Sequence, residues 1–369
     1  MTSAGPVPLR SLHVITSNAR RGAETFAVEL VQSLECHGHE GRVVALMESG
    51  SDRIHAAPHL GASRRSLVML RALSRAAESA DVVVAHGSST LEACVFALAR
   101  SRKPLVNRVI GELGYWAGSP FQRLLLKGLL RRPDRHVALW AGGRAELTAD
   151  FSVPSDRIDV IPNAVSVQRF ERATTSARRE ARQRLGLPYD ARCLAYVGAL
   201  AAEKDVDAAV SAMGSLSDCH LLIAGDGPSR PHLEELAARV APGKVRFLGV
   251  TDEPAAVYTA ADLLLLPSRS EGMPGVVIEA GLVGTPSLAT AVGAVPEMLQ
   301  HGITGFITTP DGPSRLATDI RACLLDAQAV GQRAAAAFRE SYTMEQVAPL
   351  WAATIERAHA NNRRANRTR

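Results

Sequence analysis

The chain has 369 residues and a formal net charge of +5, and 46% of its residues are hydrophobic but only 4% aromatic. A chain of this length is too long to fold around one ordinary hydrophobic core and fits two domains of average size. A composition rich in Ala, Leu, Val and Gly favours helices covering a parallel sheet over an all-β sandwich. No apolar run reaches the roughly 18 residues of a membrane span. The first residues carry two prolines and no long apolar core, so no secretory signal is expected.

The positive charge is concentrated in the amino half. Residues 1–172 hold 22 Lys plus Arg against 16 Asp plus Glu, whereas the remainder holds 20 against 21. This asymmetry suits an anionic partner or an anionic membrane surface. Nucleic acid is not an expected partner, because no clustered basic face with stacking aromatics is present.

The cysteines indicate neither disulfides nor a metal site. They are scattered, odd in number, and lack CxxC or a paired histidine at metal-binding spacing. We expect them to be small buried residues in a reducing cytoplasm: Cys36, Cys94, Cys193, Cys219 and Cys323.

The first half of the chain predicts alternating strands and helices. An apolar strand at 12–16 is followed by a glycine-bearing loop and a helix over 25–37 with a periodic apolar face. Further strands are expected at 42–46, 81–85, 104–109, 136–140 and 158–162. The pattern is that of a doubly wound sheet of about 170 residues.

The second half repeats the plan after a polar, arginine-rich stretch at 168–184. Strands are expected at 193–197, 220–224, 245–248, 263–266 and 287–290, followed by helix from 305 to about 360 and a basic disordered tail at 361–369. The expected domains are therefore 1–172, 173–345 and a terminal helix with its tail, 346–369.

The stretch 263–296 contains the most informative residues. A four-leucine strand ends at Pro267, Glu271 follows in a loop, and a Met-Pro-Gly turn starts a short apolar helix that is expected to end near Gly284. Such a loop opens at the carboxyl ends of parallel strands, where ligands bind. Glu271 and Glu279 are alternatively two solvated glutamates. Glu279, however, is embedded among apolar helix residues, which argues for a role.

Eight segments occur in an order that carries a family resemblance. RRGAE and VIPNAV lie in the first half, and VGALAAEK, IAGDGP, FLGV, SRSEGMPGVVIEA, AVGAVPEML and GITGF in the second. Together they resemble the retaining glycosyltransferases of the GT-B fold, specifically family 4, over nearly the whole chain. The resemblance implies two Rossmann-like domains facing each other across a cleft: an acceptor-side first domain and a second domain that binds the nucleotide-sugar. The C-terminal helix is expected to return to the first domain.

The resemblance also implies an activity. Members move a sugar from a nucleotide-diphospho-sugar, here a UDP- or GDP-sugar, to an acceptor hydroxyl with retention of configuration and without a metal. The hydroxyl attacks the face from which the diphosphate leaves, and the diphosphate takes the proton. No cofactor is expected, and the sequence DVD at 205–207 is interpreted as acids of a first helical turn.

The donor-side residues are carried over by their motif positions. Lys204 matches the lysine at the diphosphate, where a fixed cation stabilises the leaving group. Glu279 matches the carboxylate on the ribose, and Glu271 the one near the transferred sugar and its reacting face. Backbone N–H groups and close turns are expected at Gly198, Gly225, Gly227, Gly272, Met273 and Gly275.

On the acceptor or cleft side, the expected residues are Arg21, Gly22, Arg108 and Asn163. Gly22 matches a glycine that lets the backbone approach the donor phosphate or the acceptor. Asn163 is expected to shape the floor between the domains. Glu24 is interpreted as a first-turn residue that suits the helix dipole.

Three positions depart from the family pattern. Ala199 replaces a usual second arginine on the diphosphate, Ile110 a usual histidine near the donor sugar, and Arg21 the first glycine of a pair. Losing one cation is expected to cost several kcal/mol of transition-state stabilisation unless another replaces it. The candidates are Arg20, Arg21 and Arg108, in loops that we expect on the cleft side. A non-catalytic nucleotide-sugar-binding homologue acting as a partner or regulator therefore stays an alternative. A nucleotide-sugar epimerase is a third, without supporting motifs.

Segment 120–135 predicts a leucine-rich helix with arginines and a lysine around it. This pattern is typical of an interfacial helix, although such leucines are often core. The expected location is the cytoplasm, with peripheral contact at the inner face of a membrane as a further hypothesis. The acceptor is expected to bind at the loops 88–90 and 111–119. The sequence of these loops does not identify it as a glycan, a lipid-linked sugar or a small natural product.

Overall fold

The computed structural model describes residues 8–19, 21–50, 55–63, 66–188 and 190–367. The chain folds into two compact units, Met1–Ala164 with Met344–Arg369, and Val165–Thr343. The expected boundary after Arg172 therefore falls inside the second unit. The reason is packing: Phe170 is 1% exposed and its ring lies 6.2 Å from that of Tyr258 in the same unit.

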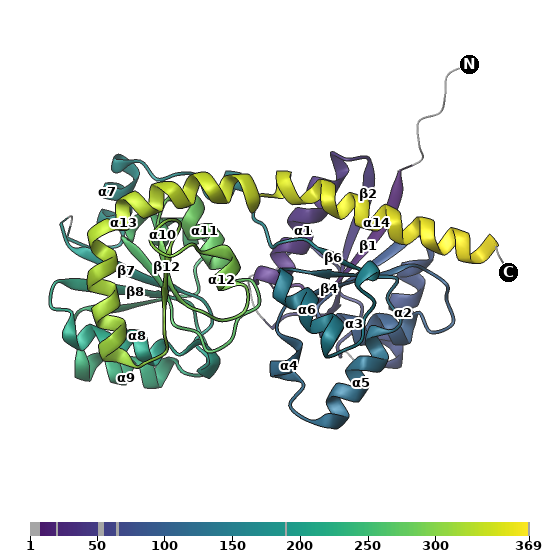
Figure 1. Cartoon of the computed structure of the whole chain (residues 1–369), viewed down its shortest axis with the longest axis horizontal. Coiled ribbons are helices and arrows are strands. Elements are labelled where there is room, and N and C mark those ends of the chain that lie inside the picture. Colours follow the sequence, from purple (N-terminus) through teal and green to yellow (C-terminus); the bar gives the residue numbers. More distant parts are fainter. Residues whose placement is uncertain (1–7, 20, 51–54, 64–65, 189, 368–369) are drawn as a thin grey trace, which may run out of the picture. The chain divides into compact units, whose positions relative to one another are not determined.

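The first unit contains a parallel sheet of six strands in the order β2-β1-β3-β4-β5-β6 (Figure 1). The order 2-1-3-4-5 is that of flavodoxin-like doubly wound sheets. Its strands are β1 (Leu9–Ser17), β2 (His39–Met47), β3 (Val82–His86), β4 (Leu105–Val109), β5 (Arg135–Ala138) and β6 (Ile158–Val160). Its helices are α1 (Gly22–Glu35), α2 (Leu67–Glu78), α3 (Ser88–Ala97), α4 (Leu113–Trp116), α5 (Pro120–Leu130), α6 (Ala141–Ala149) and α14 (Met344–Arg367).

The second unit contains another parallel sheet, with the order β12-β11-β10-β7-β8-β9. Numbered within this unit, the strands have the order 6-5-4-1-2-3, which is the Rossmann order 3-2-1-4-5-6 in reverse. Its strands are β7 (Arg192–Val197), β8 (Cys219–Ala224), β9 (Val245–Gly249), β10 (Leu263–Leu266), β11 (Ser287–Thr290) and β12 (Phe306–Thr308). Its helices are α7 (Thr175–Arg184), α8 (Val206–Ala212), α9 (Arg230–Val240), α10 (Pro254–Ala260), α11 (Gly275–Val283), α12 (Val295–Met298) and α13 (Pro313–Ser341).

The central strands are mostly apolar and buried because helices cover both faces of each sheet. All residues of β3, β4 and β10 are buried, as expected for parallel strands between helical layers. The two sequence-predicted strands at 263–266 and 287–290 are confirmed with the same bounds.

The C-terminal helix α14 belongs to the first unit, as predicted. Trp351 and Ile355 of α14 are fully buried and share a core with Phe26 and Leu30 of α1. The predicted disordered tail is wrong as far as the structure describes it, because α14 continues to Arg367. Thr368 and Arg369 lie outside the described residues.

Cysteine burial follows the sequence prediction with one exception. Cys94, Cys193, Cys219 and Cys323 are buried free thiols, whereas Cys36 is exposed. Cys36 directly follows the last residue of α1, where the helix leaves the core. Within the described ranges, no helix is long and apolar enough to cross a membrane.

A buried histidine pair lies in the core of the first unit. His13 Nδ1 lies 3.0 Å from His86 Nε2, and His13 Nε2 lies 3.1 Å from the Ser11 hydroxyl. Burial lowers the pKa of His13 to about 3, with a smaller effect from His39. Burial, His13 and Arg108 hold the pKa of His86 well below its usual value. Both imidazoles are therefore neutral in the folded protein.

This pair predicts that the first unit loses stability as the pH falls. Unfolded histidines titrate near pH 6.5, so below that pH the unfolded state binds protons that the folded pair does not. Each histidine then lowers the free energy of unfolding by up to about 1.4 kcal/mol per pH unit. All three tryptophans, Trp116, Trp140 and Trp351, belong to this unit. Urea unfolding followed by tryptophan fluorescence at pH 7.5, 6.5 and 5.5 measures the effect, and equal stability at the three values would contradict it.

Candidate active site

The switch point of the second sheet lies between β7 and β10. The chain leaves β7 towards β8 and β9 on one side and returns to place β10 on the other side. In open α/β sheets, the loops after two such strands diverge at the carboxyl edge, and ligands bind in the crevice between them. Lys204 follows β7 and Glu271 follows β10.

Lys204 and Glu271 form an ion pair between these two loops. Lys204 Nζ donates to Glu271 Oε1 at 2.8 Å, and the Ser268 hydroxyl donates to the same oxygen at 2.7 Å. The lysine side chain is 23% exposed and the glutamate side chain 9%. The two loops are also joined by a backbone bond from Arg269 N–H to the Glu203 carbonyl at 2.8 Å. The cation and the carboxylate are therefore held in fixed positions before any ligand binds.

The acids of the DVD segment contact an arginine and a histidine. Asp205, in a left-handed conformation with φ of 47°, precedes α8 and accepts two bonds from Arg269, at 3.1 and 3.2 Å. Asp207 lies in the first turn of α8 and 2.6 Å from His232 Nε2. In the described part of the chain, no group of three or more His, Cys, Asp or Glu side chains is placed to hold a metal. Asp207 is thus a first-turn acid, as predicted, and Asp205 is the residue that precedes the helix.

Glu279 projects from α11 towards a buried tyrosine of α10. The Tyr258 hydroxyl donates to Glu279 Oε2 at 2.7 Å, and Tyr258 is fully buried. Burial raises the pKa of Tyr258 well above its usual range, and the negative charge of Glu279 adds to this effect. The hydroxyl is consequently a donor at all physiological pH values and orients the carboxylate.

The family resemblance implies that Glu279 binds the donor, so removing this hydroxyl is expected to weaken donor binding and to leave the chemical step largely intact. In Tyr258→Phe, Glu279 loses a charged hydrogen bond, a kind of contact worth about 1.5–3 kcal/mol. We expect KM for the donor to rise at least about tenfold with kcat within about twofold. Steady-state kinetics measures the split, and Tyr342→Phe is the matched control. An unchanged KM would show that Tyr258 does not orient the glutamate for binding.

The loop Glu271–Gly275 is braced by the turn after β11. Gly293 has φ of +55°, and a Cβ there would lie 2.2 Å from the Glu271 carbonyl oxygen. Ala294 N–H donates to the Gly272 carbonyl at 2.8 Å. Met273, within the loop, is 7% exposed and anchors the loop in the core. The helix α11 begins at Gly275, directly after this loop, and its N-terminus has no side-chain cap.

Gly198, Gly225 and Gly227 bring the ends of β7 and β8 into backbone contact. Gly198 and Gly225 have φ of +154° and +145°, and a Cβ on Gly225 would lie 1.8 Å from the Gly198 carbonyl oxygen. A Cβ on Gly227 would lie 2.4 Å from the Leu200 carbonyl oxygen. The loop holding the exposed Ala199 is fixed by the Tyr196 hydroxyl, which donates to the Ala199 carbonyl at 2.8 Å.

Gly225→Ala is expected to be strongly destabilising, because the new methyl group meets backbone that cannot rotate away. We expect a loss of about 3 kcal/mol or more, near the upper end of single substitutions. Gly243 has φ of +76° with open space around its Cβ position. Gly243→Ala is therefore a control that carries only the conformational cost of about 1–2 kcal/mol. Calorimetric unfolding compares the two, and equal losses would argue against the close contact.

Arg108 lies in the core of the first unit. It is part of strand β4, and is 1% exposed, not in a surface loop as the sequence suggested. Its Nη2 donates to Asn163 Oδ1 at 3.0 Å, and its guanidinium carbon lies 3.7 Å from the centre of the Phe26 ring. Burial lowers the pKa of Arg108 to about 9, against the opposing charge of Glu24. This environment makes Arg108 and Asn163 a structural pair beneath α1.

Arg21 and Gly22 lie at the start of α1. Arg21 precedes the helix and is exposed, and its side chain does not cap it. Gly22 is the first helical residue, and a Cβ added to it would have no described atom within 4 Å. Glu24 lies in the first turn, as expected, and burial raises the pKa of its carboxyl. Arg20 lies outside the described residues.

Sequence reasoning missed the side chains that orient the two glutamates. Ser268 and Tyr258 make these contacts, and Tyr196 and Gly293 hold the adjoining loops. Tyr258 lies 21 positions before its partner, in a different helix. Ser268 had a local signal, since it stands three residues before Glu271 in the same loop.

Two Rossmann-type sheets in one chain define the GT-B fold class. The structure resembles that of Anabaena HepE in complex with UDP-glucose, with a TM-score of 0.83 and 19% identity over 94% of this chain and 99% of that one. Sucrose-phosphate synthase from Thermosynechococcus elongatus gives 0.82 and 19%, over 96% and 100%. At these identities the similarity concerns the fold.

Sequence comparison identifies the family. A model described as Glycosyltransferase Family 4 matches residues 20–169, and one described as Glycosyl transferases group 1 matches residues 191–326. Together they match more than half of the chain, which belongs to this family of glycosyltransferases, as its motifs predicted.

Curated relatives share part of their length with this chain. Alpha-D-kanosaminyltransferase from Streptomyces kanamyceticus is 30% identical over 71% of this chain and 64% of its own. D-inositol 3-phosphate glycosyltransferase from Thermobispora bispora is 32% identical over 61% and 57%. The matched segments thus span less than two thirds of these relatives.

Proposed function

We propose that the protein transfers a sugar from a nucleotide-diphospho-sugar, a UDP- or GDP-sugar, to an acceptor hydroxyl with retention of configuration. The observation that carries the proposal is the Lys204–Glu271 pair at the switch point of the second sheet, 2.8 Å apart and largely buried. A fixed cation beside a carboxylate suits a diphosphate next to a sugar. The structural similarity to a protein in complex with UDP-glucose supports the donor class.

In the proposed reaction the glycosidic C1–O bond to the diphosphate breaks while a new C1–O bond forms to the acceptor oxygen on the same face. The acceptor proton passes to a diphosphate oxygen. Lys204 stabilises the charge that grows on the leaving diphosphate, and Glu271 holds hydroxyls of the transferred sugar. Glu279, oriented by Tyr258, accepts from the ribose hydroxyls. The first turn of α11, beside Gly275, faces the anionic part of the donor.

The proposed reaction needs no metal, because side chains supply the positive charge. The acids of the DVD segment, which would be the natural ligands, are already paired with Arg269 and His232. Of the three arginines proposed to replace the missing cation at Ala199, Arg108 is buried, Arg21 is exposed, and Arg20 lies outside the described residues. Arg21 therefore stays a candidate for the second cation. Arg21→Gln is expected to lower kcat more than Arg144→Gln, an exposed arginine on α6, and equal effects would argue against the role.

The donor assignment is tested by thermal shift with UDP, GDP and their sugars. A ligand that binds the native state stabilises the protein, and the gain grows with affinity. It is about 2.7 kcal/mol when the ligand concentration is one hundred times Kd. We expect one nucleotide series to stabilise the protein in the presence of EDTA. Lys204→Met is expected to reduce the shift. The alternative, a non-catalytic binding homologue, predicts the same shifts without turnover, and no observation favours it.

We further propose that α5 contacts an anionic membrane surface. Phe121, Leu124 and Leu125 are 74%, 69% and 50% exposed, and Leu130 is the buried residue of the helix. Leu126, Leu129 and Leu130 lie in or against the core, whereas Leu124 and Leu125 face away from it. Arg123 and Arg131 are exposed on the same helix and its end. Apolar side chains flanked by cations are the pattern of interfacial binding.

Vesicle sedimentation tests the membrane contact. With vesicles containing anionic lipid, we expect binding in low salt that is reduced in high salt and absent with neutral vesicles. Leu124→Glu with Leu125→Glu is expected to abolish it, whereas Leu325→Glu, at an equally exposed leucine of α13, is the control. Failure of the wild-type protein to bind anionic vesicles in low salt would remove the idea.

A further inference from the structure

The second unit contains a cavity at the amino edge of its sheet, away from the loops that carry Lys204 and Glu271. Its volume is about 480 Å³, within the range of small-molecule sites. It is lined where β7, β10 and β11 begin, by the first turns of α7, the end of α11 and the middle of α13. All of these elements belong to one compact unit.

The lining is rich in arginine. Arg172, Arg178, Arg182 and Arg192 line the cavity, against the two acids Asp190 and Asp262. The lining therefore carries an excess of two positive charges. Arg192 makes one ion pair, at 3.4 Å with Asp218, and both side chains are largely exposed. An excess of positive charge in the lining favours an anionic ligand.

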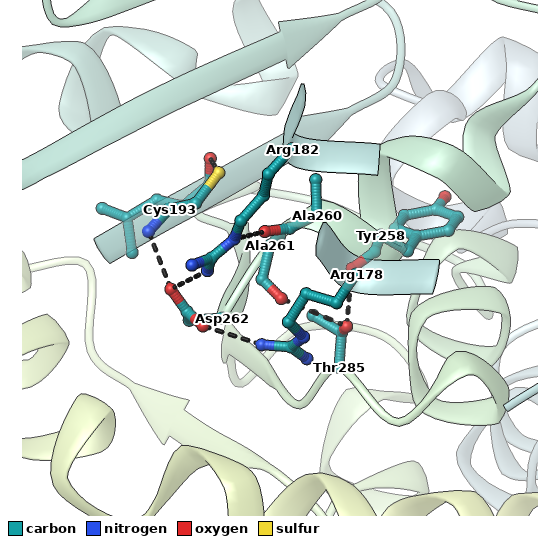
Figure 2. A network of polar contacts seen from close by, with 9 residues as sticks. Arg178, Arg182, Cys193, Tyr258, Ala260, Ala261, Asp262 and Thr285 are labelled. Carbon is teal, nitrogen blue, oxygen red and sulfur yellow. Dashed lines mark hydrogen bonds and ion pairs between the residues drawn. The ribbon is translucent and has the colours of Figure 1, made fainter. Parts of the chain in front are cut away.

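Asp262 organises two of these arginines, as Figure 2 shows. Its Oδ1 accepts from Arg178 Nη1 and its Oδ2 from Arg182 Nη2, both at 2.8 Å, and Cys193 N–H donates to Oδ2 at 2.8 Å. Arg182 also donates to the Ala260 carbonyl at 3.0 Å and is 8% exposed, so its role is structural. Arg178 is 31% exposed. Since only its Nη1 is bonded within the described chain, its other donors are available to a ligand.

The rest of the lining suits a phosphorylated ring compound. Thr174 precedes α7 and its hydroxyl accepts from the Ala177 N–H at 3.1 Å, so the helix dipole and the N–H groups before Ala177 are what favour a phosphate there. Gln328 of α13 adds a polar side chain, while Leu324 and Pro286 supply apolar surface for a ring. Arginine with a helix N-terminus is a recurrent phosphate-binding combination.

We propose that this cavity binds the phosphate monoester of a small ring compound, such as a sugar phosphate or a nucleoside monophosphate. Arg172 and Arg178 contact the phosphate together with the first turn of α7, and the ring lies against α13. This site is separate from the donor crevice and does not depend on the proposed transferase reaction.

Isothermal titration of the full chain with glucose 6-phosphate, AMP and inorganic phosphate tests the proposal. We expect at least one ester to bind at millimolar affinity or better, and more tightly than inorganic phosphate. Arg172→Gln and Gln328→Trp, both at exposed positions, are expected to weaken binding at least fivefold. The first removes a cation, and the second fills the cavity without changing charge. If Gln328→Trp does not fold, Arg172→Gln decides alone.

Two controls separate this site from others. Arg239→Gln makes the same charge change at an exposed residue of α9 that does not line the cavity, and Lys204→Met disables the donor crevice. Both are expected to leave ester binding within about twofold of wild type. The proposal is overturned if no ester binds, or if Arg172→Gln has no greater effect than Arg239→Gln. It is also overturned if Lys204→Met abolishes binding, since the ester then occupies the donor crevice.

Discussion

Replacing Lys204 by methionine is expected to reduce kcat for sugar transfer by about 10²–10³-fold. This is the magnitude seen when one preorganised electrostatic contact to a developing charge is removed, about 2.7–4 kcal/mol. Lys204 is held by Glu271 at 2.8 Å and is 23% exposed, so no reorganisation is needed when charge appears on the diphosphate. The missing arginine at Ala199 makes the protein more dependent on this lysine.

The chain provides a matched control for this substitution. Lys244 is the other lysine of residues 165–343, and it lies before β9, at the opposite edge of the sheet. Lys244→Met is expected to retain wild-type kinetics. Transfer should be measured at saturating donor, so that a loss in kcat is not mistaken for weaker binding. A Lys204→Met variant with more than half of the wild-type kcat would contradict the assigned role.

Glu271→Ala is expected to abolish measurable transfer and also to destabilise the protein. The carboxylate accepts from both Lys204 and Ser268 and its side chain is 9% exposed. Removing it leaves a partly buried ammonium group and a hydroxyl without their partner, a cost of about 1–3 kcal/mol. Because the sugar loses its carboxylate and the lysine loses its anchor, we expect kcat to fall at least 100-fold, about 2.7 kcal/mol.

Two further variants separate the two effects of Glu271. Glu271→Gln keeps the shape and a hydrogen-bond acceptor, so it is expected to restore most of the stability but little of the activity. Glu235→Ala removes an exposed glutamate of α9 and is expected to change neither. Calorimetry and kinetics on the same preparations measure both quantities. Full transfer activity in Glu271→Ala would refute the assignment.

Much of the fold could be predicted from the sequence because parallel strands are continuous apolar runs. The strands at 263–266 and 287–290 have the predicted bounds, and the Gly284 stop of α11 is a left-handed residue with φ of 94°. Strand β12 was missed. It has three residues, Phe306–Thr308, and pairs with β11, so only tertiary pairing distinguishes it from a loop.

The candidate site was predictable only in its motif residues. Lys204 and Glu271 lie 67 positions apart and meet because β7 and β10 are neighbours in the sheet, which local patterns do not reveal. Arg108 shows the opposite case. It was expected in a cleft-side loop as a functional cation, but it lies in β4, where Phe26 and Asn163 contact it. Burial of a charged residue depends on distant partners, which spacing along the chain does not give.

The most direct test is a turnover assay with labelled UDP- and GDP-sugars in the presence of EDTA, following release of the nucleoside diphosphate without an added acceptor. Water then replaces the acceptor hydroxyl, so the assay does not require its identity. We predict slow hydrolysis of at least one donor, lost in both Lys204→Met and Glu271→Ala. Binding of UDP or GDP with no consumption of any sugar donor, with or without candidate acceptors, would contradict the account and favour a non-catalytic homologue.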